Sequence, residues 1–439
     1  MTLNNFLLPF AVCLLCNQFG NCAGAVTSPT NGNASKGENE LHTELFERRN
    51  YNIHVRPVAN DSVVLKLYLG MALINIVKLD EELQVLHTNT WFRMSWNDRN
   101  LTWTPSDYGN ITMIRVPSSL IWKPDIYLYN TARADFEHFS STVKVLIMSD
   151  GRVLWVPPAL FSSFCPMNWR YFPYDTQACT LKFGSWTYNG NLVEIHPFSG
   201  DEPSVDMTDY VPHSEWEVVG ADGRISTVYY PCCPEPYMDA SFTLTLRRLA
   251  APYVYAVILP CVVVEVVTLA TFWLPLDAKE RLTTGMLNLV VLVILNSDMS
   301  QMLPTKYGST APFIVTMYDF TFVMLVVSLI FSIGSLNVHH HIVFGSMPAW
   351  IRSLFLQVLS RLLFVDTKAT SGRTHANRQL ADETAADNMD EAHRAERDAY
   401  AAIHNEWKQV AKVIDRLLFV IFLICFVIAW IIFATYSSG

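Results

Sequence analysis

The stretch ERLTTGMLNLVVLVILNSDMSQML, from Glu280 to Leu303, decides how the rest of the chain is interpreted. It is long enough to cross a bilayer, for which about 20 residues suffice. Steps of three or four residues place one stripe of side chains on a single helix face: Glu280, Thr283, Leu287, Val290, Ile294, Ser297 and Gln301. Several copies around a shared axis would line a pore. A single copy buried in a bundle would instead bond its polar groups to neighbouring helices.

The second half of the chain contains four apolar segments long enough to span a membrane. They are Pro252–Leu274, Leu282–Leu303, Pro312–Leu336 and Leu417–Tyr436. Residues 1–25 are typical of a secretory signal peptide, with a short apolar run and an Ala-Gly-Ala cleavage site. With a cleaved signal the N-terminus is extracellular, and four crossings return the C-terminus to the same side. The Lys and Arg residues near the expected inner turns agree with this orientation.

The first half is polar and rich in Trp and Tyr. Between about Glu40 and Arg248, short alternating runs are separated by Gly, Pro, Asn and Asp, which predicts about ten strands in an all-β, immunoglobulin-like sandwich. A helix is expected at Glu40–Arg49. Four Asn-x-Ser/Thr sites predict glycosylation of this extracellular region: Asn33, Asn60, Asn100 and Asn110.

These features predict a multi-domain protein with an intracellular helical segment and a four-helix transmembrane bundle. The expected parts are a signal peptide (1–25), an extracellular β-sandwich domain (26–250), three membrane helices (251–336), an intracellular connection (337–413), and a fourth membrane helix with a short extracellular C-terminus (414–439). Within the connection, Met347–Val365 is amphipathic and should lie along the inner membrane surface. Arg373–Lys412 should form a soluble helix that leads into the last crossing.

The composition argues against several other classes of function. The chain has 439 residues, of which 51% are hydrophobic, and a formal charge of −9. This charge gives no support to nucleic-acid binding. No Gly-rich phosphate loop or nucleophile motif stands out, so neither an enzyme nor a cofactor is predicted.

Two sets of polar residues in the crossings need partners or an explanation. Glu265 lies within an apolar run, where a carboxylate is unfavourable unless it is paired. Lys279 and the polar face of the Glu280–Leu303 helix are candidate partners by proximity. The run His339-His340-His341 ends the third crossing and could bind a metal. An interfacial positive cap is the favoured interpretation, and no metal site is predicted.

The chain contains nine cysteines. Four of them lie in the region expected to be extracellular, where disulfides can form, and fall into two pairs: Cys165 with Cys179, and Cys232 with Cys233. The first pair encloses thirteen residues, which include Phe172, Pro173 and Asp175. Cross-linking a loop near this length stabilises a fold by about 3 kcal/mol in the entropic treatment. A simple staple is one interpretation of the loop.

A β domain with this cysteine spacing, ahead of four crossings, resembles the pentameric Cys-loop receptor family, and the resemblance extends over nearly the whole chain from about residue 40. The resemblance implies a ligand-gated channel. It also implies a multi-pass protein of the plasma membrane, in contact with membrane lipid, for which synapses are one possible location. It also implies that Phe172, Pro173 and Asp175 help to convey binding to the pore. Glu81 and Arg248 match a family ion pair at the domain junction; two unrelated surface charges are the alternative.

The adjacent cysteines point to a subfamily. Neighbouring Cα atoms are about 3.8 Å apart, whereas most disulfides need about 4.4 Å or more, so a bond between Cys232 and Cys233 would be strained. The run from Tyr230 to Tyr237, YPCCPEPY, resembles the agonist-capping loop of nicotinic acetylcholine receptor α-type subunits. The alternative is a loop with two free thiols.

Five aromatic residues in family motifs extend the resemblance: Tyr129, Trp186, Tyr230 and Tyr237 on the principal binding face, and Trp91 on the complementary face. Leu154 and Val156 would be apolar contacts of the complementary face. Ring faces suit a cationic, acetylcholine-like agonist, because a quaternary ammonium has no N–H to donate. For any single ring, the alternative is a place in the sandwich core. Because both faces look complete, a homopentamer is expected and a heteropentamer is the alternative.

In the pore stripe, the resemblance makes Glu280 an acidic ring that selects cations and Thr283 a narrow polar ring. Leu287, Val290 and Ile294 would form apolar rings that close the pore by dewetting. The sequence departs from the family pattern at Val290, usually Leu, at Leu287, usually Ser or Thr, and at Gln301, often acidic. A ligand-binding or assembly subunit that does not conduct alone is therefore the second hypothesis. Monovalent cations are the expected permeant ions, and calcium is left open.

Overall fold

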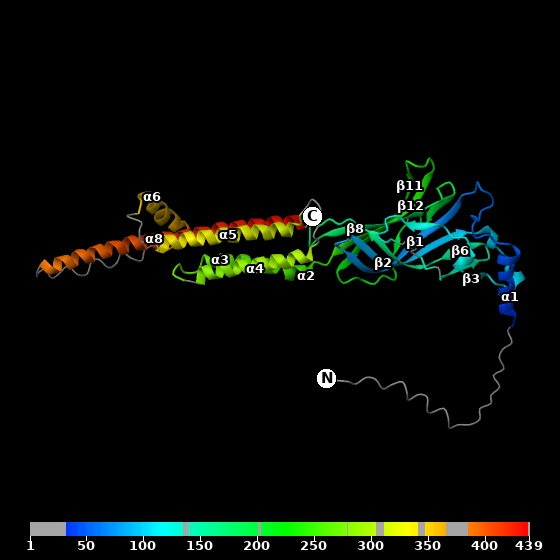
Figure 1. Cartoon of the computed structure of the whole chain (residues 1–439), viewed down its shortest axis with the longest axis horizontal. Helices are drawn as coiled ribbons and strands as arrows, with labels where there is room; N and C mark the ends of the chain where they lie inside the picture. Colours follow the sequence, from blue (N-terminus) through cyan, green and yellow to red (C-terminus); the bar gives the residue numbers. More distant parts are fainter. Residues whose placement is uncertain are drawn as a thin grey trace, which may run out of the picture.

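The computed structural model describes residues 32–134, 139–140, 142–200, 203–278, 280–303, 311–340, 347–365 and 385–437. The predicted signal peptide, Lys279 and His341 lie outside these ranges, as does the start of the predicted soluble helix. A β domain occupies one end of the elongated molecule and a helical bundle the other (Figure 1). The end of α8 lies close to the β domain, which is the arrangement expected when both termini are extracellular.

The first sheet contains eight strands: β1 (Leu65–Asp80), β2 (Val85–Asn97), β3 (Met113–Pro117), β5 (Lys144–Met148), β6 (Arg152–Trp155), β7 (Pro158–Phe164), β9 (Val193–Pro197) and β10 (Val205–Asp206). Its main order is β10-β1-β2-β6-β5-β3, while β7 pairs with β2 and β9 with β1. A helix precedes the strands, as predicted, although it begins earlier, with α1 (Gly32–His42) continuing into a π-helical turn (Thr43–Arg48).

The second sheet has the order β11-β12-β8-β4, with β4 at Ile126–Leu128, β8 at Thr176–Ser185, β11 at Trp216–Tyr229 and β12 at Pro236–Arg248. Alternating apolar residues from both sheets meet in one core, where the rings of Phe92 (β2) and Phe183 (β8) lie 4.5 Å apart. The all-β sandwich predicted from the alternating runs is therefore confirmed.

Four helices are long and apolar enough to cross a membrane: Ala251–Thr271, Glu280–Met302, Phe313–His340 and Tyr400–Tyr436. The first combines α2 (Ala251–Tyr253), a π-helical turn (Val254–Ile258) and α3 (Leu259–Thr271). The second is α4 (Glu280–Met302), the third is α5 (Phe313–His340), and the fourth is part of α8 (Ala385–Ser437). The four predicted crossings correspond to these helices, and the described part of the soluble helix is continuous with the last.

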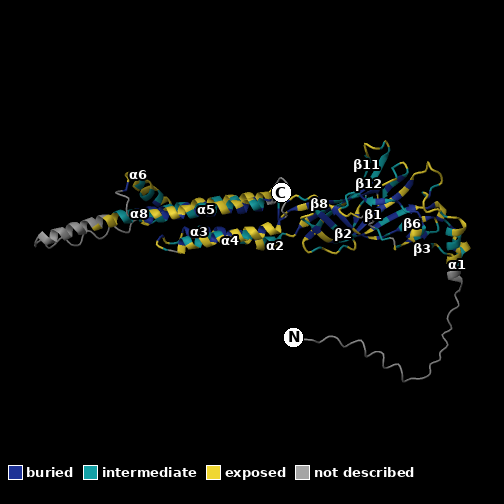
Figure 2. Cartoon of the chain, in the orientation of Figure 1, coloured by how far each residue is buried: buried dark blue, intermediate teal, exposed yellow. Residues whose placement is uncertain are grey.

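The amphipathic segment is helical, with α6 (Ala349–Ile351), a π-helical stretch (Arg352–Leu359) and α7 (Ser360–Leu362) in succession. Every fourth residue along it is an exposed apolar one: Trp350, Leu354, Val358 and Leu362. Such a face is suited to the membrane boundary. On the other side, Arg352 pairs with Glu406 of α8. Figure 2 shows the mixture of exposed and intermediate residues along this segment.

Glu265 finds its partners on α5 and α8. Thr321 Oγ1 donates to one carboxylate oxygen at 2.9 Å, and Trp430 Nε1 donates to the other at 2.5 Å. Neither donor is one of the two candidates named by proximity, Lys279 and the polar face of the pore helix, between which the sequence did not decide. Those candidates are close to Glu265 in sequence, whereas α5 and α8 pack against α3.

Candidate functional site

Four of the predicted ligand-binding aromatics lie on the second sheet and its adjoining loops. The rings of Tyr129 and Trp186 are 6.1 Å apart at 72°, and those of Tyr230 and Tyr237 are 5.8 Å apart at 72°. Trp186 is 63% exposed and Tyr230 36%, which is unusual for residues of this size unless something covers them. In each edge-to-face pair one ring, that of Trp186 or Tyr230, is thus exposed to solvent, and its partner, Tyr129 or Tyr237, is half-buried.

Asp125 holds the Trp186 turn in place. Its two carboxylate oxygens accept hydrogen bonds from the Ser185 hydroxyl at 2.5 Å and from the Thr187 backbone N–H at 2.7 Å, on either side of Trp186. The Trp186 backbone N–H donates to the Asp125 carbonyl at 3.2 Å. The sequence interpretation missed Asp125, although it belongs to the quoted motif WKPDIYLYN.

Tyr129 is fixed by its own hydroxyl, which donates to the Ser185 carbonyl at 2.6 Å. Burial raises the pKa of Tyr129 above its ordinary value, so the phenol stays neutral and remains a donor. Its ring lies directly over Gly184, where a Cβ atom would come within 2.4 Å of the hydroxyl oxygen. A side chain at position 184 would therefore displace this ring.

Cys232 and Cys233 are free thiols in the structure, so the predicted bond between them is not formed there. Cys232 is exposed, and the hydrogen bond with its thiol raises the pKa of Cys233. The strain argued from the Cα spacing is consistent with an open pair, and the oxidised pair stays a prediction. The disulfide between Cys165 and Cys179 is present, with Cα atoms 4.9 Å apart, and confirms the other pairing.

The predicted complementary face belongs to the other sheet. Trp91 on β2 is 41% exposed and pairs with Pro158 of β7. Leu154 of β6 lies opposite Ser95 of the same β2 strand, and Val156 follows directly after β6. The predicted principal and complementary residues therefore lie on different sheets of the chain.

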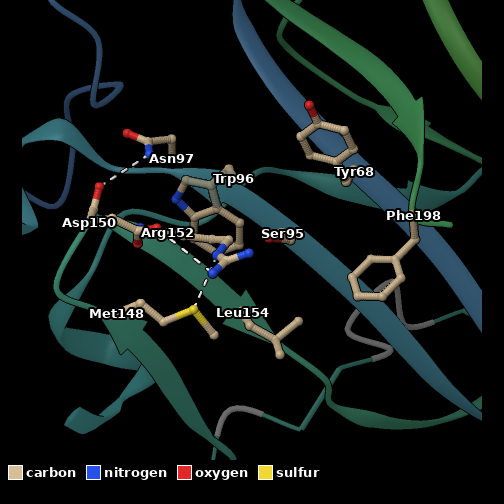
Figure 3. A pocket seen from close by; sticks show the side chains of 9 residues that line it. All are labelled: Tyr68, Ser95, Trp96, Asn97, Met148, Asp150, Arg152, Leu154 and Phe198. Carbon is tan, nitrogen blue, oxygen red and sulfur yellow. Dashed lines mark hydrogen bonds and ion pairs between the residues drawn. The ribbon is translucent and has the colours of Figure 1, made fainter. Parts of the chain in front are cut away.

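A pocket of about 500 Å³ lies on the first sheet (Figure 3). Leu154 lines it together with Tyr68, Ser95 and Phe198. At its edge, Arg152 Nε donates to the Met148 sulfur at 3.1 Å. Of the predicted ligand residues only Leu154 lines this pocket, so the aromatic pairs remain the better candidate for cation binding.

The predicted coupling residues meet where the β domain contacts the helices. Phe172 and Pro173 are buried, and the Phe172 ring lies 5.0 Å from that of Tyr253 in α2. The backbone N–H of Phe313, at the start of α5, donates to the Arg170 carbonyl at 3.1 Å. The disulfide loop thus rests on two membrane helices.

Arg248 lies at the centre of this junction. It donates to both carboxylate oxygens of Asp175, at 2.7 and 3.2 Å, and to Glu81 at 2.6 Å. Its guanidinium also lies 4.4 Å from the centre of the Trp216 ring. The Glu81–Arg248 pair is a real contact rather than two unrelated surface charges, and its part in coupling stays a prediction.

Burial alone would lower the pKa of Arg248, but Asp175 and Glu81 outweigh it and raise that pKa. For Glu81, burial is the largest effect, and it raises the pKa of this carboxyl in spite of the guanidinium. Asp175 is almost fully buried, whereas the Glu81 side chain is 22% exposed. Glu81 is therefore the partner that is more accessible to solvent and that more readily separates from Arg248.

The predicted pore stripe faces away from the bundle. All seven of its residues are exposed in the isolated chain: Glu280, Thr283, Leu287, Val290, Ile294, Ser297 and Gln301. The opposite face of α4 is buried, and there Asn288 donates to the Val264 carbonyl at 2.9 Å and contacts Thr268 Oγ1 at 3.0 Å. The exposed face of α4 is thus the one expected of a pore-lining helix, and the buried face is the one expected of a helix that bonds its polar groups to its neighbours.

Three of the predicted glycosylation sites, Asn60, Asn100 and Asn110, are exposed on the β domain. Asn33 lies in α1, and its side chain is outside the described residues. The use of these sites stays a prediction.

Two family models and several known proteins match most of the chain. Residues 38–250 match the family model of the neurotransmitter-gated ion-channel ligand binding domain, and residues 257–396 match that of the neurotransmitter-gated ion-channel transmembrane region. The chain is 36% identical over 346 residues to the neuronal acetylcholine receptor subunit alpha-3 of Homo sapiens, a match that covers 79% of this chain and 67% of that protein.

Two other relatives belong to the same group. The subunit alpha-4 of Rattus norvegicus is 37% identical over 332 residues, covering 75% of this chain and 51% of that protein. The subunit alpha-2 of Gallus gallus is 37% identical over 329 residues, covering 75% and 61%. The chain spans between about half and two thirds of the length of these relatives. Together with the β sandwich and the four candidate spans, these matches show that the chain belongs to the neurotransmitter-gated ion-channel family, whose members are channels rather than enzymes.

Proposed function

We propose that the chain is a subunit of a pentameric, cation-selective channel opened by a quaternary ammonium agonist of the acetylcholine type. The observation that carries the proposal is the two edge-to-face pairs, Tyr129 with Trp186 and Tyr230 with Tyr237, each of which has one exposed ring. A desolvated cation gains about 0.5–2 kcal/mol from each ring face it contacts. The names of the relatives, neuronal acetylcholine receptor subunits, support the same ligand class.

The arrangement of the binding residues supports a site between subunits. The aromatic pairs belong to the second sheet, while Trp91 and Leu154 belong to the first. One chain supplies both halves of the proposed site, but on different sheets, which supports a site completed by a neighbouring chain. A homopentamer is consistent with this, and a heteropentamer with partner subunits is the alternative.

Cation selectivity is supported by the position of Glu280. Its carboxylate is exposed at the first residue of α4, on the face that also carries the polar and apolar stripe. Five such carboxylates around an axis would attract cations and repel anions. Monovalent cations are the proposed permeant ions.

A voltage-clamp recording of oocytes that express the chain alone tests the proposal. Acetylcholine and other quaternary ammonium ligands should open a current that reverses at the potential expected for cations, and uninjected cells should show none. Currents opened only by ligands without a cationic group would contradict the agonist class. A chloride reversal potential would contradict the selectivity.

A second function is supported by the pore lining. Leu287 adds an apolar ring where the family usually has a polar one, which raises the barrier of a closed pore. The chain would then bind ligand or assist assembly without conducting alone. Three results together would favour this function. The chain at the cell surface would bind a labelled quaternary ammonium ligand, would give no current alone, and would yield current with a partner subunit.

A further inference from the structure

Two segments of the chain bring two histidines and a carboxylate together at the inner end of the helical bundle. Asp277 lies in the turn before α4, while His339 and His340 end α5. One ligand atom from each of these three residues lies within 4.8 Å of the others. The turn and the end of α5 are separated by more than 60 residues in the chain, so this proximity arises from the packing of the bundle.

The distances within the cluster suit a shared ion better than direct hydrogen bonds. His339 Nε2 lies 3.6 Å from the Asp277 carboxylate, which is longer than an ordinary hydrogen bond. Two ligands of one tetrahedral zinc ion, each about 2.0–2.1 Å from the metal, lie about 3.3 Å apart. A small rotation of the exposed Asp277 side chain would make up the difference.

The burial of His339 also separates this cluster from a cap of surface charges. Its side chain is only 2% exposed, and its Nδ1 atom is buried without a hydrogen-bond partner among the described residues. Its ring lies 4.7 Å from that of His340 and 6.5 Å from that of His404 on α8. The Nδ1 atom of His404 is likewise buried and unpartnered in this part of the chain. The interfacial cap favoured from the sequence requires histidines that face headgroups, whereas His339 faces a carboxylate.

The geometry points to a zinc site formed by Asp277, His339 and His340, to which His404 of α8 would add a fourth ligand if its ring turned towards them. Imidazole nitrogens and one carboxylate are ligands typical of Zn²⁺, whereas Ca²⁺ and Mg²⁺ prefer oxygen ligands throughout. Lys408 of α8 is a further positive group that acts on His339. Its charge opposes any cation at this position, so only the free energy of direct coordination could hold an ion there.

Such an ion would join the turn that begins the pore helix to α5 and α8. Asp277 precedes Glu280, the first residue of α4, by three positions. A metal bridge would therefore restrain the inner end of the pore lining without contacting the agonist site.

Metal binding to the purified full-length chain in detergent tests the site and does not depend on channel activity. After chelation, wild type should take up one Zn²⁺ per chain at micromolar concentration. Co²⁺ in the same site should give the absorption bands of a tetrahedral ion, which Zn²⁺ then abolishes. The double variant Asp277→Asn/His340→Gln changes only exposed side chains and should bind at least about tenfold more weakly, since even indirect partners of a metal contribute that much.

Matched controls use the same substitutions on the β domain, at the exposed residues Asp107 and His54. Asp107→Asn/His54→Gln should leave both readouts unchanged. His404→Gln provides a second variant. It should change the Co²⁺ spectrum even if it lowers the affinity for Zn²⁺ less than the double variant does. Wild type that binds no Zn²⁺, or a site variant that binds it with wild-type affinity and spectrum, would overturn the proposal.

Discussion

Arg281 of α4 and Asp415 of α8 are joined by two parallel hydrogen bonds of 2.7 Å, although 134 residues separate them in the sequence. Both side chains are buried. Arg281 follows Glu280 directly, so an unpaired Arg281 would act on ions at the same level of the proposed pore. Because Asp415 neutralises it on the bundle side of α4, the charge that faces the proposed axis at this level is that of Glu280.

Asp415→Asn should strongly destabilise the bundle, because it leaves a buried guanidinium without its counter-charge. Removal of one partner from a buried ion pair costs about 3–5 kcal/mol. Thermal unfolding of the solubilised protein measures this loss. Glu217→Gln, which removes the partner of Arg247 in an exposed pair, is the control and should change stability by no more than about 1 kcal/mol. Similar effects of the two variants would mean that the Arg281–Asp415 pair is not buried in the assembled protein.

Asp98 gives the β domain a specific pH dependence. The Tyr51 hydroxyl donates to this buried carboxyl at 2.5 Å, and burial raises the pKa of Asp98 to about 6. A carboxyl with a raised pKa in the folded state contributes stability below its unfolded pKa, and this contribution is lost as the pH rises through about 6. Between pH 7 and pH 4, Asp98 should thus add up to about 3 kcal/mol.

The unfolding temperature of wild type and of Asp98→Asn, measured from pH 7 to pH 4, tests this linkage. The difference between the two proteins should shift in favour of wild type as the pH falls. Asp107→Asn, a change at an exposed position, should follow the wild-type profile. Parallel profiles for wild type and Asp98→Asn would contradict the raised pKa.

Trp186→Ala should abolish binding of quaternary ammonium ligands, whereas Trp186→Phe should weaken it by about 2 kcal/mol at most, since a smaller ring face remains. Equilibrium binding to correctly assembled protein measures both. Trp122, a buried ring in the sandwich core, supplies the contrast: Trp122→Phe should reduce stability and leave the affinity of the folded protein unchanged. Unchanged affinity in Trp186→Ala would remove the aromatic pairs from the ligand site.

The adjacent cysteines predict sensitivity to mild reductant. If Cys232 and Cys233 are oxidised in the mature protein, their strained bond is more easily reduced than that between Cys165 and Cys179. Agonist response should then fall at a reductant concentration that leaves pentamers intact on native gels. A Cys232→Ser/Cys233→Ser variant should have a weaker response that reductant no longer changes. A wild-type response that is insensitive to reductant would support the free thiols of the structure.

The sequence predicted those features that depend on local periodicity. The stripe on α4 followed from a 3.6-residue repeat, and all of its members share the exposed face. Contacts between distant segments were not predictable in this way. Asp415 is 134 residues from Arg281, and Trp430 is 165 residues from Glu265, so many polar residues were equally eligible as partners. Asp125 was missed for another reason: a carboxylate that braces a turn has no periodic signature.

Glu280→Gln tests the proposed pore axis most directly. The substitution keeps the size of the side chain and removes up to five negative charges from one level of a pentamer. Cation conductance should therefore fall, and the reversal potential in a salt gradient should move towards that of chloride. The shift should be partial, because Asp298 is also exposed on α4 and still favours cations.

Glu280→Asp is the matched control, since it retains the charge and should retain selectivity. A carboxylate bonded away from the axis predicts a different result, in which Glu280→Gln assembles poorly and the surviving channels keep wild-type selectivity. Because Arg281 is neutralised by Asp415, a shift in selectivity can be assigned to the lost carboxylate rather than to an unmasked arginine. Single-channel conductance and dilution potentials at normal surface expression separate the two cases, and wild-type values for both would place the pore on another face of α4.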